Sequence, residues 1–322
     1  MMDMIGFFAA ALVVGLLVGI LSGLLGVGGG TIMVPVFRLG FGLSAVVATA
    51  TSLFAIIPTS ISGMVGHLRD KTCIPKLGLA MGLAGACTST LGVRLADISP
   101  SWLVMLVAAL IIAYSAINVF RKAFAAKKQE SAVSAKAISD KRAGEASAAA
   151  TGSGAADAAI NGVAAIGAGD ADAVATAAGA PTGAANATAT ANTRPNLSAK
   201  DLLFGAMIGL IAGLASGYVG VGGGFIMVPM MLGILNIPMR YASGTSLIAI
   251  MILAVPGVVA QIMLGHVDFV VGIAISAGTI PGALIGARLV NYIPERTLRF
   301  IFGGMLLVAA VMLVVNELGL IG

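Results

Sequence analysis

Two glycine runs are the residues of this sequence whose type and spacing could bind a small anion. Both read GVGGG, at 26–30 and at 220–224. Three consecutive glycines interrupt a helix, because glycine loses much conformational entropy on folding and tolerates positive φ angles. The helix that resumes presents free N–H groups and the positive end of its dipole, which attract an anion without a cationic side chain. We therefore expect the substrate-binding glycines to be Gly28, Gly29, Gly30, Gly222, Gly223 and Gly224.

Close helix packing is the alternative role of these glycines, since small residues let membrane helices approach one another. Pro35 and Pro229 follow the two runs at the same spacing. Proline has no backbone N–H to donate, so we expect each to end or kink the short helix after the glycines.

Hydroxyl side chains accompany each glycine run in the same order. Such hydroxyls can donate hydrogen bonds to the oxygens of an anion without adding charge, which keeps binding weak enough for release. The alternative is that each hydroxyl bonds to a carbonyl of its own helix, which is common in apolar helices. The predicted binding residues of this kind are Ser22, Thr49, Thr51, Ser52, Ser216, Ser243, Thr245 and Ser246.

Ionisable side chains are sparse, and no Asp, Glu or Lys occurs at the middle of an apolar segment. Arg94 and Arg288 lie near segment ends, where an arginine anchors a helix at the headgroups or attracts an anion. His67 and His266 each follow a glycine, which leaves open a simple interfacial position or a shared role in proton coupling. Energy coupling has no evident residue in the sequence.

The elements that must position these residues lie in a membrane. The chain has 322 residues, of which 59% are hydrophobic and 10% charged, whereas about 25% of residues in a soluble domain are charged. So few charges argue against a soluble enzyme or a nucleic-acid-binding protein. The net charge of +5 comes from segment ends and one linker. We expect a multi-pass protein of the cell membrane, a bacterial plasma membrane, with the lipid bilayer and a small anion as partners.

Membrane enzymes need a nucleophile or a metal cluster inside the bilayer, and neither pattern is present. Cys73 and Cys87 form no metal-site spacing, and the one Gly-Asp pair, Gly169-Asp170, lies in the linker. We therefore predict no catalytic residue, no metal, no cofactor and no enzymatic activity.

Eight segments approach the roughly 20 apolar residues that span the hydrocarbon core as a helix. Two shorter pieces, 31–39 and 225–235, follow the glycine runs and extend the preceding helix or form re-entrant half-helices. We predict an all-α integral membrane protein with about eight transmembrane helices in two duplicated four-helix halves with glycine-broken helices. The expected spans are 4–25, 43–66, 74–95, 102–120, 202–221, 241–264, 269–290 and 298–315.

An internal repeat relates the two halves. Residues 22–35 read SGLLGVGGGTIMVP and residues 216–229 read SGYVGVGGGFIMVP, identical at eleven of fourteen positions with an offset of 194. We predict a first transmembrane repeat at 1–120, a disordered Ala-rich linker at 121–200 and a second repeat at 201–322. The linker holds almost no large apolar residues with which to offset the entropy of ordering.

The orientation of the repeats follows from counting crossings. Four crossings per half make the repeats parallel and place the basic linker in the cytoplasm by the positive-inside rule. The basic residues of the second half favour the reverse orientation, which inverted repeats would explain, but inversion needs an odd number of crossings per half. The pieces 31–39 and 225–235 could supply a fifth crossing only if they are extended or the membrane is thinly spanned, so segment lengths favour the parallel arrangement.

The doubled SGxxGVGGGxIMVP motif, followed in each half by a Thr-Ser pair, resembles the TauE/SafE sulfite-exporter family, also called the 4-toluene sulfonate uptake permease family. The resemblance covers roughly 5–120 and 202–318. It implies transport of small anions, usually sulfite, organosulfonates or related sulfur compounds. A passive anion channel or a non-transporting membrane scaffold is the alternative.

Overall fold

The computed structural model describes residues 4–100, 102–121 and 198–317, and within them every regular element is a helix. The predicted linker at 121–200 lies almost wholly outside the described residues. The helices are α1 (Met4–Leu25), α2 (Gly30–Phe41), α3 (Ala45–Arg69), α4 (Pro75–Ile98), Trp102–Arg121, α7 (Ala199–Val219), α8 (Gly224–Gly233), α9 (Met239–Met263), α10 (Phe269–Leu289) and α11 (Glu295–Glu317).

The all-α membrane fold is confirmed. Seven of the described helices are long and apolar enough to cross a bilayer, and they coincide with the first seven predicted spans. The eighth predicted span lies in α11, which has 23 residues but carries Glu295, Arg296 and Arg299 in its first turns. The pieces after the glycine runs form separate helices of 12 and 10 residues that continue past Pro35 and Pro229, so neither proline ends its helix.

Local sequence signals set several helix ends. Ser44 Oγ accepts a hydrogen bond from Val47 N ahead of α3, and Asp268 Oδ1 accepts from the N–H groups of Val270 and Val271 ahead of α10. Both side chains satisfy N–H groups that have no partner within the first turn of a helix. Gly42 ends α2 in the left-handed conformation, which glycine adopts without steric cost.

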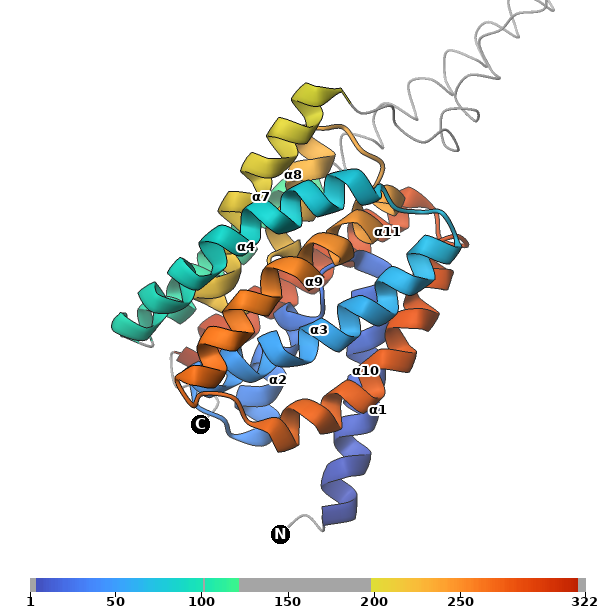
Figure 1. Ribbon diagram of the computed structural model, residues 1–322. Coiled ribbons are helices and arrows are strands. Elements are labelled where there is room, and N and C mark those ends of the chain that lie inside the picture. The colour runs from blue at the N-terminus through green and yellow to red at the C-terminus, as the bar shows by residue number, and fades with distance from the viewer. Residues whose placement is uncertain (1–3, 101, 122–197, 318–322) are drawn as a thin grey trace, which may run out of the picture. The chain divides into compact units, whose positions relative to one another are not determined.

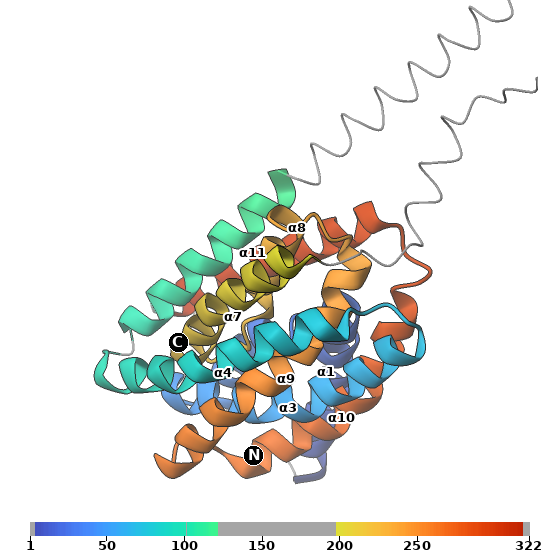
Figure 2. The ribbon, with the colours of Figure 1, turned by 45° about the horizontal axis from the view of Figure 1, so that its top comes forward.

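Six long helices form a row in the order α7, α4, α9, α3, α10 and α1, as the contacts between neighbours show. Figures 1 and 2 show α4 beside α7 and α1 beside α10, with α9 and α3 between these two pairs. Helices that differ by the offset of 194 occupy mirrored places in this row. Each half therefore contributes its first helix to a pair whose other member belongs to the other half.

Small residues allow these two outer pairs to pack closely. A methyl group added to Gly19 would overlap the backbone of Thr279, and one added to Gly213 would overlap the backbone of Gly85. Glycines repeat every fourth residue along the contacts, a spacing that places them on one face of the helix. They are Gly15, Gly19 and Gly23 in α1, Gly278, Gly282 and Gly286 in α10, and Gly209, Gly213 and Gly217 in α7.

The two halves are inverted, so the prediction of parallel repeats is wrong. Gly63 of α3 lies against Leu247 of α9, and Gly257 of α9 lies against Leu53 of α3, so these equivalent helices run antiparallel. Along α1 and α10 the residue numbers of contacting pairs increase together, and the same holds along α3 and α10. Both α1 and α3 therefore run parallel to α10 and in the same direction as each other.

Helix α2 must therefore return the chain between α1 and α3. The rings of Phe7 in α1 and Phe41 in α2 lie 5.2 Å apart, which places the end of α2 beside the start of α1. At a rise of about 1.5 Å per residue, α2 covers about 18 Å, and the turn and connection at its ends complete the return. Length counting failed because it favoured four crossings over a fifth crossing made by so short a helix.

Inversion also removes the conflict in the distribution of basic residues. We call the end where Trp102–Arg121 ends and α7 begins the linker face, and the end where α1 begins the terminal face. Only Arg38 and Arg94 among the described Lys and Arg residues lie near the terminal face. The linker face, which the positive-inside rule assigns to the cytoplasm, carries Arg69, Lys71, Lys76, Arg121, Lys200, Arg240, Arg288, Arg296 and Arg299.

Candidate functional site

Both glycine runs interrupt a helix as predicted. Gly28 and Gly29 have φ angles of 80° and 83°, and Gly222 and Gly223 have φ angles of 88° and 69°. The hydrogen bonds resume at Ile32 N and Met33 N, which donate to Gly29 O at 3.1 and 3.0 Å. The preceding N–H groups point out of the start of α2, where a helix leaves its first donors without an intrahelical acceptor.

The two interruptions meet at the centre of the described unit. A methyl group on Gly30 would overlap the backbone of Val221, and one on Gly224 would lie 2.6 Å from Gly26 O. Ile56 of α3 and its equivalent Ile250 of α9 cover both turns, and their side chains are fully buried. The starts of α2 and α8 are thus adjacent, and two buried isoleucines lie against them.

Hydroxyls on α3 and α9 tie each interruption to the other half. Ser246 Oγ donates to Gly26 O at 2.5 Å, and Ser52 Oγ donates to Gly220 O. Thr51 Oγ1 accepts from Asp268 N at 3.0 Å, and in the same way Thr245 accepts from Ile74 N. Thr49 and Ser243 bond to carbonyls of their own helices and pack against Gly220 and Gly26. The structure brings Thr49, Ser52, Ser243 and Ser246 to the interruptions. Thr51 and Thr245 instead bond to the segments that precede α10 and α4, so all six of these hydroxyls have protein partners.

Ser22 and Ser216 differ from the other predicted hydroxyl residues. Both are buried, and neither Oγ has a hydrogen-bond partner. The Cβ of Ser22 is 3.5 Å from the position that a Cβ on Gly29 would occupy, and Ser216 has the same relation to Gly223 at 3.4 Å. Each unpartnered hydroxyl therefore lies beside the glycines that precede α2 or α8. Thr31 Oγ1, in the first turn of α2, is also buried without a partner.

The chemistry available here is anion binding by neutral donors. Each half supplies N–H groups at a helix start, the positive end of the helix dipole and a serine hydroxyl that can donate. At the start of α8, the Gly224 N–H already donates to Gly222 O at 2.8 Å. Among the buried side chains of the described residues there is no Asp, Glu, Lys or Arg, and His67 is the one buried histidine. No group of three or more His, Cys, Asp or Glu residues that could hold a metal ion occurs within the described ranges.

The two histidines occupy different positions of one repeated motif. The offset of 194 aligns His67 with Gln261 and Thr72 with His266. His67 Nδ1 lies 2.7 Å from Thr72 Oγ1, and His266 Nδ1 lies 2.9 Å from Gln261 Oε1. Each half therefore has one histidine in the same kind of bond, at the linker face in the first half and at the terminal face in the second. The offset alone could have revealed these pairs.

Arg94 and Arg288 are exposed near opposite membrane faces. Arg94 lines a cavity of about 620 Å³ together with Asp97, Pro256 and Met263. Sequence reasoning missed Asp97, Gln261 and the Ile56–Ile250 pair, because their roles come from contacts between the halves.

Comparison with known proteins identifies the same family that the duplicated glycine motif resembles. The model of the family described as sulfite exporter TauE/SafE matches residues 11–313. The chain is 26% identical over 284 residues to the probable membrane transporter protein YdhB of Bacillus subtilis (strain 168), covering 88% of this chain and 90% of YdhB. It is 24% identical over 291 residues to the probable membrane transporter protein YunE of the same strain, covering 88% and 86%.

A shorter match joins the chain to the probable membrane transporter protein YjnA of that strain, with 29% identity over 119 residues, 37% of this chain and 45% of YjnA. No solved structure matches the chain. The family model covers almost the whole sequence, including both interrupted helices and the hydroxyl residues that tie them together. The chain therefore belongs to the TauE/SafE family of membrane transporters and is a multi-pass protein of the cell membrane.

Proposed function

We propose that the chain is a secondary carrier of small anions, specifically sulfite, organosulfonates or related sulfur compounds. The observation that carries the proposal is the pair of buried, unpartnered hydroxyls of Ser22 and Ser216, each beside the start of an interrupted helix. A buried polar group without a partner costs about 1–3 kcal/mol. An oxyanion at this position would accept from the hydroxyl and from the free N–H groups together. The family's description as sulfite exporters supports a sulfur oxyanion as that ligand.

The inverted repeat supports a carrier over a passive channel. Inverted halves with discontinuous helices allow one half to rock against the other around a fixed site, so that the site opens to each face in turn. A channel needs a continuous polar path, whereas fully buried Ile56 and Ile250 cover both helix starts.

Uptake into proteoliposomes tests this function with two probes, radiolabelled methanesulfonate and radiolabelled sulfite. We expect saturable uptake of at least one probe, and we expect unlabelled internal anion to accelerate entry of the labelled external anion. Such acceleration is a property of carriers, whereas a channel shows conductance. If neither anion showed uptake or acceleration, the proposed function would be overturned.

Ser22→Ala and Ser216→Ala test the site itself. A hydrogen bond to a charged group contributes about 1.5–3 kcal/mol, so each variant should raise KM about tenfold or more. Ser89→Ala is the matched control, because Ser89 is also buried and unpartnered but its Oγ lies against Gly257 of α9 rather than beside the glycines that precede α2 and α8. Normal KM in the Ser22/Ser216 double variant would exclude these hydroxyls from the site while leaving the carrier function intact.

A further inference from the structure

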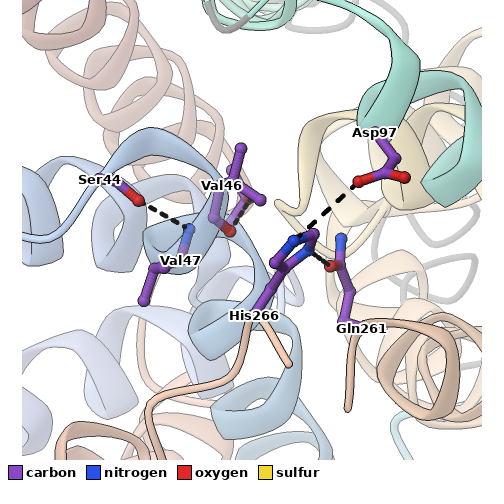
Figure 3. A network of polar contacts seen from close by, with 7 residues as sticks. Ser44, Val46, Val47, Asp97, Gln261 and His266 are labelled. Atoms are coloured by element: carbon purple, nitrogen blue, oxygen red, sulfur yellow. Dashed lines mark hydrogen bonds and ion pairs between the residues drawn. The ribbon is translucent and has the colours of Figure 1, made fainter. Parts of the chain in front are cut away.

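A polar cluster outside the central site lies at the terminal face. His266 is in the turn between α9 and α10, Gln261 is in the last turns of α9, and Asp97 is near the end of α4. Figure 3 shows the imidazole between the Gln261 amide and the Asp97 carboxylate. His266 Nδ1 lies 2.9 Å from Gln261 Oε1, and His266 Nε2 lies 4.0 Å from Asp97 Oδ1.

This geometry prepares His266 to take a proton at one nitrogen. Because the Gln261 amide oxygen faces the ring, Nδ1 carries a proton and donates a hydrogen bond to Oε1. In the neutral tautomer Nε2 then has a lone pair, and that lone pair faces a carboxylate. A proton bound at Nε2 would lie between the imidazole ring and the Asp97 carboxylate.

The cluster lines a small cavity that is also lined by a residue packed against the second glycine interruption. The cavity has a volume of about 10 Å³, and its lining includes His266, Asp97 and Thr49. That volume is about the space of one water molecule. Thr49 in turn packs directly against Gly220, where α7 ends. One hydroxyl residue therefore separates the His266 cavity from the interrupted helix.

Among the residues that the structure describes, no other charged residue lines this cavity. Helix α3 contributes Ala45, Val46 and Thr49, the helix Trp102–Arg121 contributes Val104 and Met105, and α4 contributes Asp97 with Ala96. Arg94 lines the neighbouring cavity beside Asp97. Asp268, two residues after His266, accepts hydrogen bonds from the start of α10.

In the inverted repeat, the two positions equivalent to His266 and Asp97 carry no ionisable side chain, although Asp70 lies nearby and accepts a hydrogen bond from Asn291 at 2.7 Å. By the offset of 194, Thr72 is equivalent to His266, and Asn291 is equivalent to Asp97. His67, which stands for Gln261, is fully buried, and its Nε2 lies 2.8 Å from Gly23 O. The repeat symmetry therefore fails at the residues that could bind a proton, although both halves keep the histidine hydrogen bond.

We propose that His266 Nε2, facing Asp97, is a proton-binding site and that the proton bound there enters together with the anion. The inference rests on the proposed function and makes the chain a proton–anion symporter. Its physical reason is the apolar centre: Val27, Val221, Ile56 and Ile250 are buried around the two helix starts, and a net charge in such surroundings is costly. A proton that moves with a monovalent anion cancels that net charge.

Methanesulfonate uptake into proteoliposomes tests the inference, because this sulfonate stays ionised over the working pH range and any pH dependence comes from the protein. We expect an external solution more acidic than the interior to raise wild-type uptake several-fold. A pH-sensitive dye inside the vesicles should report acidification in step with uptake. His266→Gln should lose the stimulation and the acidification but retain exchange of labelled for unlabelled methanesulfonate.

Two further variants and a chemical probe separate coupling from structure. Asp97→Asn should reduce the stimulation, whereas Asp70→Asn, which removes an exposed carboxylate near the linker face, should leave it unchanged. Diethylpyrocarbonate should modify partly exposed His266 and spare buried His67 in the wild type. The modification should remove the stimulation, and hydroxylamine should restore it.

Each outcome decides the matter. Wild-type uptake that ignores the pH gradient overturns the symport and leaves the carrier standing. Stimulation that persists in His266→Gln overturns the site, and so does a loss of exchange equal to the loss of stimulation, since that indicates a structural role. If the wild type takes up neither methanesulfonate nor sulfite, the proposed function is overturned, and this inference is overturned with it.

Discussion

Ser246 Oγ donates a hydrogen bond of 2.5 Å to the carbonyl oxygen of Gly26, the residue that follows α1. Ser52, 194 residues earlier than Ser246, makes the equivalent bond to Gly220 O after α7. Each half of the chain therefore satisfies the carbonyl at which the other half interrupts its first helix. Irregular backbone at this depth is tolerated only where protein or a wet cavity satisfies its polar groups, so neither half can complete its interruption alone.

Ser52→Ala and Ser246→Ala should each lower the free energy of unfolding by about 1–3 kcal/mol, because each leaves a buried carbonyl without a donor. Thermal unfolding of the purified protein in detergent measures this. Ser276→Ala is the control, since Ser276 Oγ bonds to Gly272 O within its own helix. An equal loss in Ser276→Ala would show that the bonds between the halves have no special weight.

Gly213→Ala and Gly282→Ala should destabilise the packing of α7 on α4 and of α10 on α1. The added methyl group would overlap the Gly85 backbone in the first case and the Leu16 backbone in the second, and overpacking typically costs about 1–3 kcal/mol. Gly304→Ala should instead be neutral or stabilising, because nothing lies within 4 Å of the added carbon and alanine is the better helix former. Unfolding temperatures that do not differ among the three variants would contradict the close contact of these helices.

Cysteines at Ile98 and Met263 should react with a membrane-impermeant maleimide in intact cells, and cysteines at Lys200 and Tyr292 should react only after permeabilisation. The first pair lies at the terminal face and the second at the linker face, which the basic residues assign to the cytoplasm. Replacement of both native cysteines by alanine removes the background. Labelling of positions 98 and 292 from the same side would contradict the inverted repeats.

Ile56→Ala and Ile250→Ala should each cost about 2–5 kcal/mol through the lost burial and the cavity left behind. The two side chains cover the glycine turns of both halves, so their truncation also opens space between the helix starts. We expect leak of methanesulfonate along its gradient in the double variant, without acceleration by internal anion. Ile61→Ala is the control, because it makes the same truncation on α3 at a side chain that is exposed rather than buried. A double variant that remains as tight as the wild type would remove these residues from the barrier.

Local sequence determined much of this architecture. Apolar length predicted seven helices that the structure places at the expected residues, because a bilayer-spanning helix satisfies its backbone within itself and its side chains alone decide its position. The glycine runs likewise predicted the interruptions, since positive φ angles at Gly28, Gly29, Gly222 and Gly223 are a property of the residue type. The offset of 194 established which residues are equivalent.

Tertiary structure decided how the halves meet. The antiparallel course of α3 and α9 depends on whether α2 returns the chain, and a helix of 12 residues is ambiguous by length. The hydroxyls of Ser22 and Ser52 look alike in sequence, yet Ser52 bonds to Gly220 O and Ser22 has no partner. Hydrogen-bond partners 168 or 220 residues apart leave no local signal. Their identity follows from which helix faces pack together, and that packing is a property of the whole chain.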